Sequence, residues 1–514
     1  MQTSPSVRVA VVTDDVSRSL LGLLADPVES VRESALSLFS RVEDVDGATA
    51  APTLLTLLLP TALARIARVP VAEESEELRL AWAKLLRALL CRDAARATVC
   101  AALGDIAAAV AALAGDAFHA VKSEALSAMV DLSRAASGHV HLALGVLASA
   151  AVGCLSCVLY LRVFNGEQRI FLSLAPSPPP INSAPLYYFA LCFRHQRGPV
   201  RTAAIVALGA LLPLGGEALG PLFYDVVRTP LLLTRFDRTT GVRRALASVA
   251  ASWLGGALPP HALAARGIEP LLFSLLCGLV GDESEDVAME ALSVLEGAAA
   301  SRLGGGLCAK GVSHMGDDID VAAAAAAGDE DKSTAQGDAS ALSGMDDAAD
   351  PTRFAALLPA PFASRASEAL RALTRLLLAP AVALLIDGLK DWTGRVRIDA
   401  AGGLRTLLVL AERAATKHLD AILMALCTGA RDDESVVRTR LGSCASVLGA
   451  TVAPAAALGV LLPQLRGDVP LCANAMHWAA ALAVLATTLS AMTCVSAFLP
   501  MRARAPALGP PPPL

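Results

Sequence analysis

The sequence predicts an all-α solenoid, a stack of about ten helical hairpins interrupted by a disordered acidic insertion. Three observations predict it: an amphipathic stripe that recurs eight times, charges at fixed positions beside the stripe, and a regular spacing between most copies. Only 4% of the 514 residues are aromatic, while 54% are hydrophobic. That composition favours closely stacked helices rich in Ala, Leu and Val over one large globular core.

The stripe is clearest at Val396, which is followed by apolar or small residues at positions plus 4, 7, 8 and 11. This spacing is typical of one face of an α-helix. The same pattern begins at eight anchors: Val31, Leu78, Val121, Val200, Val242, Val287, Val396 and Val437. Eight copies of five positions give 40 slots, of which 39 are hydrophobic. The overall composition would fill only about 22 of them. The exception is Gly403.

Charges accompany the stripe in most copies. The residue after the anchor is basic in seven copies, namely Arg32, Arg79, Lys122, Arg201, Arg243, Arg397 and Arg438. The residue five before the anchor is acidic in seven copies, namely Asp26, Glu73, Asp116, Asp237, Asp282, Asp391 and Asp432. The exceptions are Ala288 and His195. A charge pattern tied to the hydrophobic register indicates a repeated structural unit.

The spacing gives the size of that unit. Successive anchors lie 47, 43, 79, 42, 45, 109 and 41 residues apart. We interpret 79 as close to two units and 109 as two units plus an insertion. Another apolar helical run precedes most copies, as in Leu54–Ile66 and Ile422–Cys427, and Pro60 is expected to kink or break the first of these. Two helices per 40 to 47 residues is the period of HEAT and armadillo repeats.

The arrangement of a turn acid followed by Val-Arg resembles HEAT repeats in particular. In that family the turn acid and the second-helix arginine form ladders between neighbouring units. The resemblance therefore implies a structural role for the fourteen charges above. One hairpin cannot bury both of its apolar faces alone, whereas stacked hairpins share a continuous core.

The chain divides into four parts by composition. Residues 1–302 form an N-terminal array with an irregular insert at about 154–195, where Tyr, Phe and Pro concentrate; the insert is either a loop or translated sequence foreign to the fold. Residues 303–352 are Gly- and Ala-rich, carry ten acids between Asp317 and Asp350, and are predicted to be disordered. Residues 353–502 hold the C-terminal repeats, and 503–514 are a Pro-rich tail. Ser17–Leu24 is the expected first helix.

Charge and cysteine content bound the setting. A net charge of −5 predicts no general attraction to nucleic acid or anionic lipid. Eleven scattered cysteines, and acids at Asp14 and Asp15 that interrupt any signal peptide, favour a reduced, cytoplasmic location. Leu142–Leu161 and Ala473–Leu499 are long uncharged runs, so a membrane-embedded helical protein is one alternative. The first run contains glycines and lacks flanking basic clusters, which disfavours it.

No catalytic signature is present. The sequence has no G-x-x-x-x-G-K-[ST], G-x-S-x-G or H-E-x-x-H motif, and its eight histidines are dispersed. Cys154-x-x-Cys157 has no second pair at zinc-finger spacing. We therefore predict no enzyme activity, no cofactor and no metal.

A solenoid usually presents a surface of second helices to other proteins. The residues expected to be exposed there, and hence to be partner contacts, are Glu33, Ser37, Arg41, Lys122, Glu124, Arg243, Arg244, Arg405, Arg438 and Arg440. Most are basic, which favours an acidic partner or the protein's own acidic segment.

Taken in order, several segments resemble the HEAT-repeat dynein axonemal assembly factor family. They are Asp26-Pro27-x-Glu29-Ser30-x-Arg32, Ser75–Ala81, Asp237 with Val242–Ala245, and most specifically Asp391-Trp392 followed by Arg395-Val396. The resemblance implies a cytoplasmic, non-catalytic factor that binds dynein heavy or intermediate chains and works with chaperone machinery to preassemble dynein arms. The sequence departs from the family in its aromatic-rich insert and long acidic loop. A generic HEAT adaptor, such as a transport receptor or phosphatase-type scaffold, is the other alternative.

Overall fold

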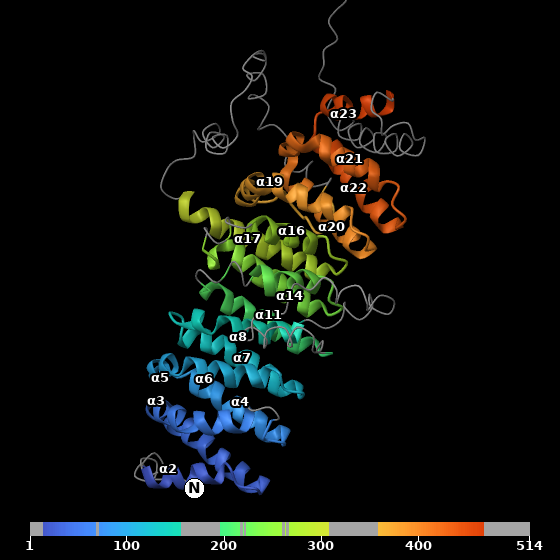
Figure 1. The fold of residues 1–514 in the computed structure, drawn as a ribbon. Helices are drawn as coiled ribbons and strands as arrows, with labels where there is room; N and C mark the ends of the chain where they lie inside the picture. The colour runs from blue at the N-terminus through green and yellow to red at the C-terminus, as the bar shows by residue number, and fades with distance from the viewer. Residues whose placement is uncertain are drawn as a thin grey trace, which may run out of the picture. The chain divides into compact units, whose positions relative to one another are not determined.

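The structure is a computed structural model that describes residues 14–67, 71–155, 196–215, 219, 223–259, 263, 267–307 and 358–466. Within these residues the regular secondary structure is entirely helical (Figure 1). The helices form two compact units, Met1–Leu275 and Leu276–Leu514. The predicted all-α, HEAT-type solenoid is confirmed.

The first unit is built from paired helices. Its helices are α2 (Asp14–Leu23), α3 (Glu29–Ile66), α4 (Glu76–Leu90), α5 (Arg96–Ala101), α6 (Leu103–Ala114), α7 (His119–Ala135), α8 (Leu144–Leu155), α11 (Gly198–Leu211), α13 (Arg228–Thr234) and α14 (Thr240–Ser252). Short helical turns are η1 (Asp93–Ala95), η2 (Val140–Leu142), η5 (Leu212–Leu214), η7 (Phe223–Val227) and η8 (Trp253–Ala257). The boundary between the two units falls within α16 (Ile268–Val280).

The second unit continues the same construction. Its elements are α17 (Glu285–Leu307), α19 (Glu368–Leu389), α20 (Gly394–Ala411), η10 (Glu412–His418), α21 (Leu419–Gly429), α22 (Ser435–Thr451) and α23 (Pro454–Arg466). Serine side chains cap two helices: Ser75 accepts the Leu78 N–H at the start of α4, and Ser367 accepts the Leu370 N–H at the start of α19.

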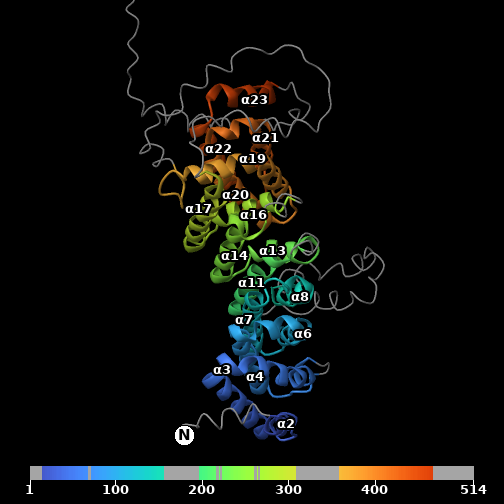
Figure 2. The same ribbon diagram turned by 90° about the vertical axis from the view of Figure 1, so that its left-hand side faces the viewer.

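All eight anchors lie in helices, and their stripes face the core. In α4 the stripe from Leu78 to Leu89 is at most 3% exposed, and in α7 the stripe from Val121 to Leu132 is at most 2% exposed. The second helices α4, α7, α11 and α14 pack on one another in chain order, and the first helices α6 and α8 form a second layer (Figure 2). Stacking therefore buries the face that a single hairpin would expose.

In the second unit α20 is buried on nearly every side, because it packs on both α19 and α22. Glycines let the end of α16 approach it closely. A Cβ at Gly281 would lie 3.0 Å from the backbone carbon of Gly402, and a Cβ at Gly403 would lie 3.3 Å from the backbone nitrogen of Gly278. The one stripe slot without a hydrophobic side chain is thus a site of close backbone contact.

The prediction for Pro60 was wrong where it expected a break. Helix α3 runs without interruption from Glu29 to Ile66, with Pro52 and Pro60 inside it, so two expected helices are joined. A proline removes one backbone hydrogen bond. Leu58, Leu59 and Ala62 are nevertheless at most 4% exposed, so packing holds the helix together on both sides of Pro60.

The interpretation of the 79-residue spacing as two units was also wrong. Helix α11 packs directly on α7 and on α8, so the copies at Val121 and Val200 belong to neighbouring repeats. The extra length lies between α8 and α11, within 156–195, which is outside the described residues. So are most of the predicted acidic loop, the run 473–499 and the Pro-rich tail.

Candidate protein-interaction surface

The turn between the two helices of a repeat has one recurring geometry. The acid five residues before the anchor accepts the backbone N–H two residues further on, as where Asp26 accepts from Val28 at 2.8 Å. The same bond occurs at Asp116 to Phe118, Asp237 to Thr239, Asp282 to Ser284, Asp391 to Thr393 and Asp432 to Glu434, at 2.7–2.9 Å. A short acidic side chain that bonds its own backbone in this way fixes the turn and the start of the second helix.

The arginine after the anchor ties down the same turn from the other side. Arg32 Nη1 donates to the carbonyl oxygens of Asp26 at 2.8 Å and Pro27 at 3.1 Å. Equivalent bonds join Arg79 to Glu73 and Glu74, Arg201 to Gln196, Arg243 to Asp237, Arg397 to Asp391 and Trp392, and Arg438 to Asp432 and Asp433. Sequence reasoning missed these bonds, although the constant six-residue separation between acid and base was a signal for them.

The remaining guanidinium nitrogens reach the acid of the next repeat. We call each such pair a rung. Arg32 donates to Glu73 at 2.9 and 3.0 Å, and Arg201 donates to Asp237 at 2.6 and 2.8 Å. Arg79 with Asp116 and Arg397 with Asp432 form two more rungs, both through paired bonds. Paired bonds between a guanidinium and a carboxylate fix orientation as well as distance.

The rungs are largely removed from solvent and stay charged near neutral pH. Burial acts to raise the pKa of Glu73, but hydrogen bonds from Arg32 and Arg65 outweigh it and hold that pKa below its ordinary value. The pKa of Asp237 and that of Asp432 are lowered in the same way, against burial, by their arginine partners. The hydrogen bond to Glu73 raises the pKa of Arg32. Fixed charges of this kind suit a structural role.

Two of the predicted ladder residues, Lys122 and Asp391, make only part of this geometry. Within the described residues no ion pair involves Lys122, and the matching position of the next copy, His195, lies outside them. Asp391 is the acid of the copy anchored at Val396. The preceding copy, anchored at Val287, has Ala288 at its basic position, so it offers no arginine there to form a rung with Asp391. Its carboxylate holds its own turn through the bond to the Thr393 N–H.

The predicted contact residues divide by exposure. Exposed ones are Glu33, Ser37, Arg41, Arg244 and Arg438, whereas Lys122, Glu124, Arg243, Arg405 and Arg440 are half-buried. Glu124 accepts a hydrogen bond from Arg87, and Arg440 donates to the Ile398 carbonyl. Arg405 donates to the Ala360 carbonyl, and burial lowers its pKa. These five side chains are therefore only partly accessible, and their role as partner contacts stays a prediction.

Arg87 is a connection that the sequence did not suggest. Its Nε donates to Asp131 and its Nη1 to Glu124, both at 3.0 Å, so it joins the last turn of α4 to two positions on α7. Arg92 similarly reaches Glu43 at 2.6 Å. These pairs link residues 37 to 49 positions apart without a recurring spacing.

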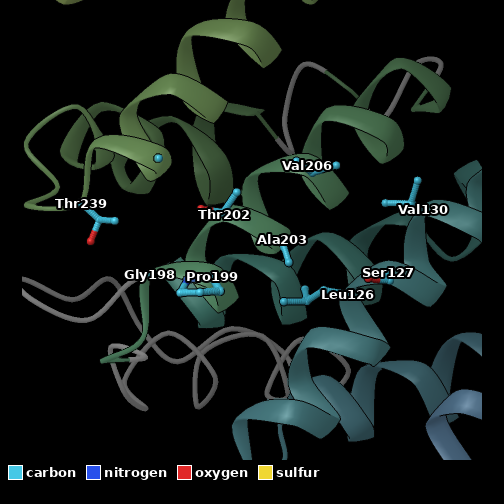
Figure 3. Close-up of a pocket in the computed structure, with 10 residues that line it drawn as sticks. Leu126, Ser127, Val130, Gly198, Pro199, Thr202, Ala203, Val206 and Thr239 are labelled. Atoms are coloured by element: carbon cyan, nitrogen blue, oxygen red, sulfur yellow. The ribbon is translucent and has the colours of Figure 1, made fainter. Parts of the chain in front are cut away.

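An apolar groove of about 480 Å³ lies across the second helices α7, α11 and α14, and Figure 3 shows the side chains around it. It is lined by Leu126, Ser127, Val130, Gly198, Pro199, Thr202, Ala203, Val206, Thr239 and Gly241, none of them charged. Leu126 is fully buried, while Val206 is 43% exposed. A Cβ at Gly198 would lie 2.9 Å from the Thr239 methyl group, so this glycine lets the starts of α11 and α14 meet.

No group of three or more His, Cys, Asp or Glu side chains in the described part of the chain could hold a metal ion. By length and composition alone, Thr49–Ile66 and Glu368–Leu389 are apolar enough to cross a membrane, and the bent pair Asp93–Ala101 and Leu103–Ala114 would make a third span. Leu54, Leu58 and Ala62 in the first segment are fully buried within the repeat array.

Repeated hairpins, rungs between neighbouring repeats and an uncharged groove across second helices define a HEAT-repeat protein of the scaffold type. A family model described as "Dynein axonemal assembly factor 5-like, TPR repeats" matches residues 1–156, and one described as "Dynein axonemal assembly factor 5, HEAT-repeat domain" matches residues 362–496. The chain belongs to the dynein axonemal assembly factor 5 family. Neither the generic adaptor nor the membrane-embedded alternative is favoured.

Two curated relatives are named dynein axonemal assembly factor 5. The Mus musculus protein is 26% identical over 458 residues and the Homo sapiens protein 27% identical over 455 residues. Each alignment covers 87% of this chain and 43% of the relative, so the chain spans less than half the length of either.

Similar solved structures include an engineered protein (14% identity, 95% of this chain and 92% of that chain, TM-score 0.36). Another is importin beta (13% identity, 94% of this chain and 55% of that chain, TM-score 0.28).

Proposed function

We propose that this chain is a non-enzymatic scaffold that binds proteins during the preassembly of axonemal dynein arms, in the cytoplasm, before the arms enter cilia or flagella. The observation that carries the proposal is the family match at two places in the chain, residues 1–156 and 362–496. The curated relatives carry the name of an assembly factor. The partners in this proposal are dynein heavy or intermediate chains together with chaperone machinery.

The geometry of the repeats suits such a role. Rungs such as Arg32–Glu73 and Arg201–Asp237 fix each second helix against the next one. Residues on the outer faces of those helices, including Glu33, Arg41 and Arg244, are therefore held at set separations. A surface that is ordered before binding loses less conformational entropy when a partner docks.

Gene disruption in a flagellated host tests the proposal directly. We expect outer and inner dynein arms to be missing or reduced in axoneme cross-sections, and motility to be lost with them. Re-expression of the chain should restore both. Axonemes with normal arms and normal beating after complete loss of the chain would refute the assembly role.

Co-purification tests the partners. The tagged chain should retain dynein heavy or intermediate chains from a cytoplasmic extract of the same host, whereas a tagged HEAT-repeat protein of another family should not. Fractionation should place the tagged chain with the cytoplasm rather than with isolated axonemes. Retention of chaperones without any dynein chain would argue against direct scaffolding of dynein subunits.

A further inference from the structure

The groove across α7, α11 and α14 points to the chemistry of a partner. We propose that it binds a short linear segment of a client protein in which an apolar side chain is flanked by aspartate or glutamate. This inference rests on the proposed function, because it treats the occupant as a client of the scaffold. It adds a location and a recognition chemistry to that function.

The shape of the groove favours a side chain inserted from outside. Leu126 and Ala203 belong to its lining, Leu126 is fully buried, and Val206 is nearly half exposed at the solvent side. Ser127, Thr202 and Thr239 add hydroxyl groups to an otherwise apolar lining. A groove of about 480 Å³ that opens to solvent can accept an apolar anchor together with adjoining backbone.

The residues beside the groove set the sign of the occupant's charge. The three described carboxylates nearest to the lining residues along the chain are Glu124, Asp131 and Asp237. Each is held by an arginine: Glu124 and Asp131 by Arg87, and Asp237 by Arg201. Their negative charge is therefore largely compensated within the fold.

Basic residues stand close to the lining residues along the chain, and Arg238 donates to the carbonyl of Gln196, two residues before Gly198. Lys122 is one helical turn before Leu126 and two turns before Val130 on α7, so the three share a helix face. Arg238 directly precedes Thr239, and Arg244 follows Gly241 by three residues; both arginines are exposed. These positions are also near the N-terminal ends of α7 and α14, where the helix dipole adds positive potential.

An apolar lining next to a positive end selects an occupant that has an apolar side chain beside acidic residues. Burial of a leucine or phenylalanine supplies affinity, while acidic flanks steer and orient the segment. A basic segment would be repelled from the same place. The acidic partner expected from the basic second helices is thereby given a defined anchor point.

Binding of labelled synthetic peptides to the full chain, followed by fluorescence anisotropy, tests the proposal. The probe is a peptide with one leucine between runs of glutamate; matched peptides carry serine for leucine, or lysine for glutamate. We expect the glutamate–leucine peptide to bind, with affinity that falls as salt is raised. The serine and lysine peptides should bind at least about tenfold more weakly.

Variants locate the binding. Val206→Glu places a carboxylate at the groove, and Lys122→Glu with Arg238→Glu reverses the positive end; each should weaken binding about tenfold. Val146→Glu, at a valine 54% exposed on α8, is the matched control and should bind like the wild type. Circular dichroism and urea unfolding check that every variant folds.

Several results would overturn the proposal. If Val206→Glu binds the glutamate–leucine peptide as tightly as the wild type does, the groove is not the binding site. If the lysine and glutamate peptides bind equally, the site has no preference for acidic residues. Tighter binding of a peptide copied from residues 336–350 would make the chain's own acidic segment the occupant. If the chain self-associates and Val206→Glu abolishes that association, the occupant of the groove is a second copy of the chain.

Re-expression in the disrupted host separates this inference from the proposed function. If Val206→Glu restores dynein arms as fully as the wild type does, the groove is not the client site and the assembly role still stands. If arms are normal without any chain, the assembly role fails, whatever the peptides bind.

Discussion

Arg201 in α11 reaches Asp237 in the turn before α14 through two hydrogen bonds, Nε to Oδ2 at 2.6 Å and Nη2 to Oδ1 at 2.8 Å. The same guanidinium donates to the Gln196 carbonyl of its own turn, and the same carboxylate accepts the Thr239 N–H. One ion pair thus joins two turns that each pin a helix start. Loss of either side chain should loosen the turn that it holds and the stacking of α11 on α14 in the neighbouring repeat.

Arg201→Ala should destabilise the first unit by about 3 kcal/mol, because it leaves the Asp237 carboxylate buried without its partner. The side chains of Arg201 and Asp237 are only 4% and 11% exposed. Urea unfolding and hydrogen exchange in α11 and α14 would measure the loss. Arg201→Lys should recover only part of it, because an ammonium cannot make the paired bonds.

Arg96→Ala is the matched control. Arg96 pairs with Asp93, but the two side chains are 61% and 88% exposed. A pair so open to solvent contributes little, so this change should cost less than about 1 kcal/mol. Equal losses for Arg96→Ala and Arg201→Ala would show that the rung is no more than a surface ion pair.

Acid should weaken the Arg32–Glu73–Arg65 cluster. The pKa of Glu73 is lowered in the folded chain from its ordinary value of 4.5, so the unfolded chain binds the proton more readily. The stabilisation is therefore fully present above about pH 4.5 and is lost as the pH falls through the folded pKa. Wild type and Glu73→Gln should differ in urea midpoint at neutral pH and converge in acid.

Glu33→Gln provides the comparison for that experiment, because Glu33 is an exposed acid on the same second helix as Arg32. We expect it to follow the wild-type midpoint at every pH. A gap between wild type and Glu73→Gln that persists unchanged in acid would mean that ionisation of Glu73 does not support the cluster.

The parts of this structure that sequence reasoning reached are those with a local or periodic signature. The stripe at Val121 or Leu78 predicts both a helix and its buried face, because side-chain direction in a helix follows from position alone. The match of Arg397 to Asp432 follows the repeat period. Trp392, which gives the sharpest family resemblance, is 77% exposed and lies outside the core.

Other features have no such signature. The contact of Arg87 with Asp131 joins residues 44 positions apart at no fixed register. The groove depends on small residues such as Gly198 and Ala203 meeting across three helices. Spacing alone also cannot separate one unit with an insertion from two units, which explains the error over 79 residues.

Gly281→Ala should destabilise the second unit by roughly 1–3 kcal/mol, because a new Cβ would press on backbone atoms that cannot move aside easily. Three atoms of Gly402 lie 3.0–3.1 Å from that Cβ position. Urea unfolding would measure the effect. Gly442→Ala is the control: nothing lies within 4 Å of its Cβ position, so the change should be neutral or stabilise α22 by up to about 1 kcal/mol. Similar losses from both changes would refute close packing at Gly281.

Alkylation should distinguish packed thiols such as Cys444 from the exposed thiol of Cys91. Cys444 in α22 is fully buried against α20, with its Sγ 3.7 Å from the Ala401 carbonyl oxygen, and burial raises its pKa to about 12. Burial raises the pKa of Cys277 as well. Cys91 is exposed, so its thiol can be reached by the reagent in the folded chain. Desolvation and the neighbouring Asp131 raise its pKa, so this reaction should be slow. The thiolate is the reactive form, so Cys444 and Cys277 should stay unmodified by iodoacetamide until urea unfolds their unit. Peptide mapping by mass spectrometry would follow each site. Native labelling of Cys444 at the rate of Cys91 would mean that α22 is not packed on α20 as described.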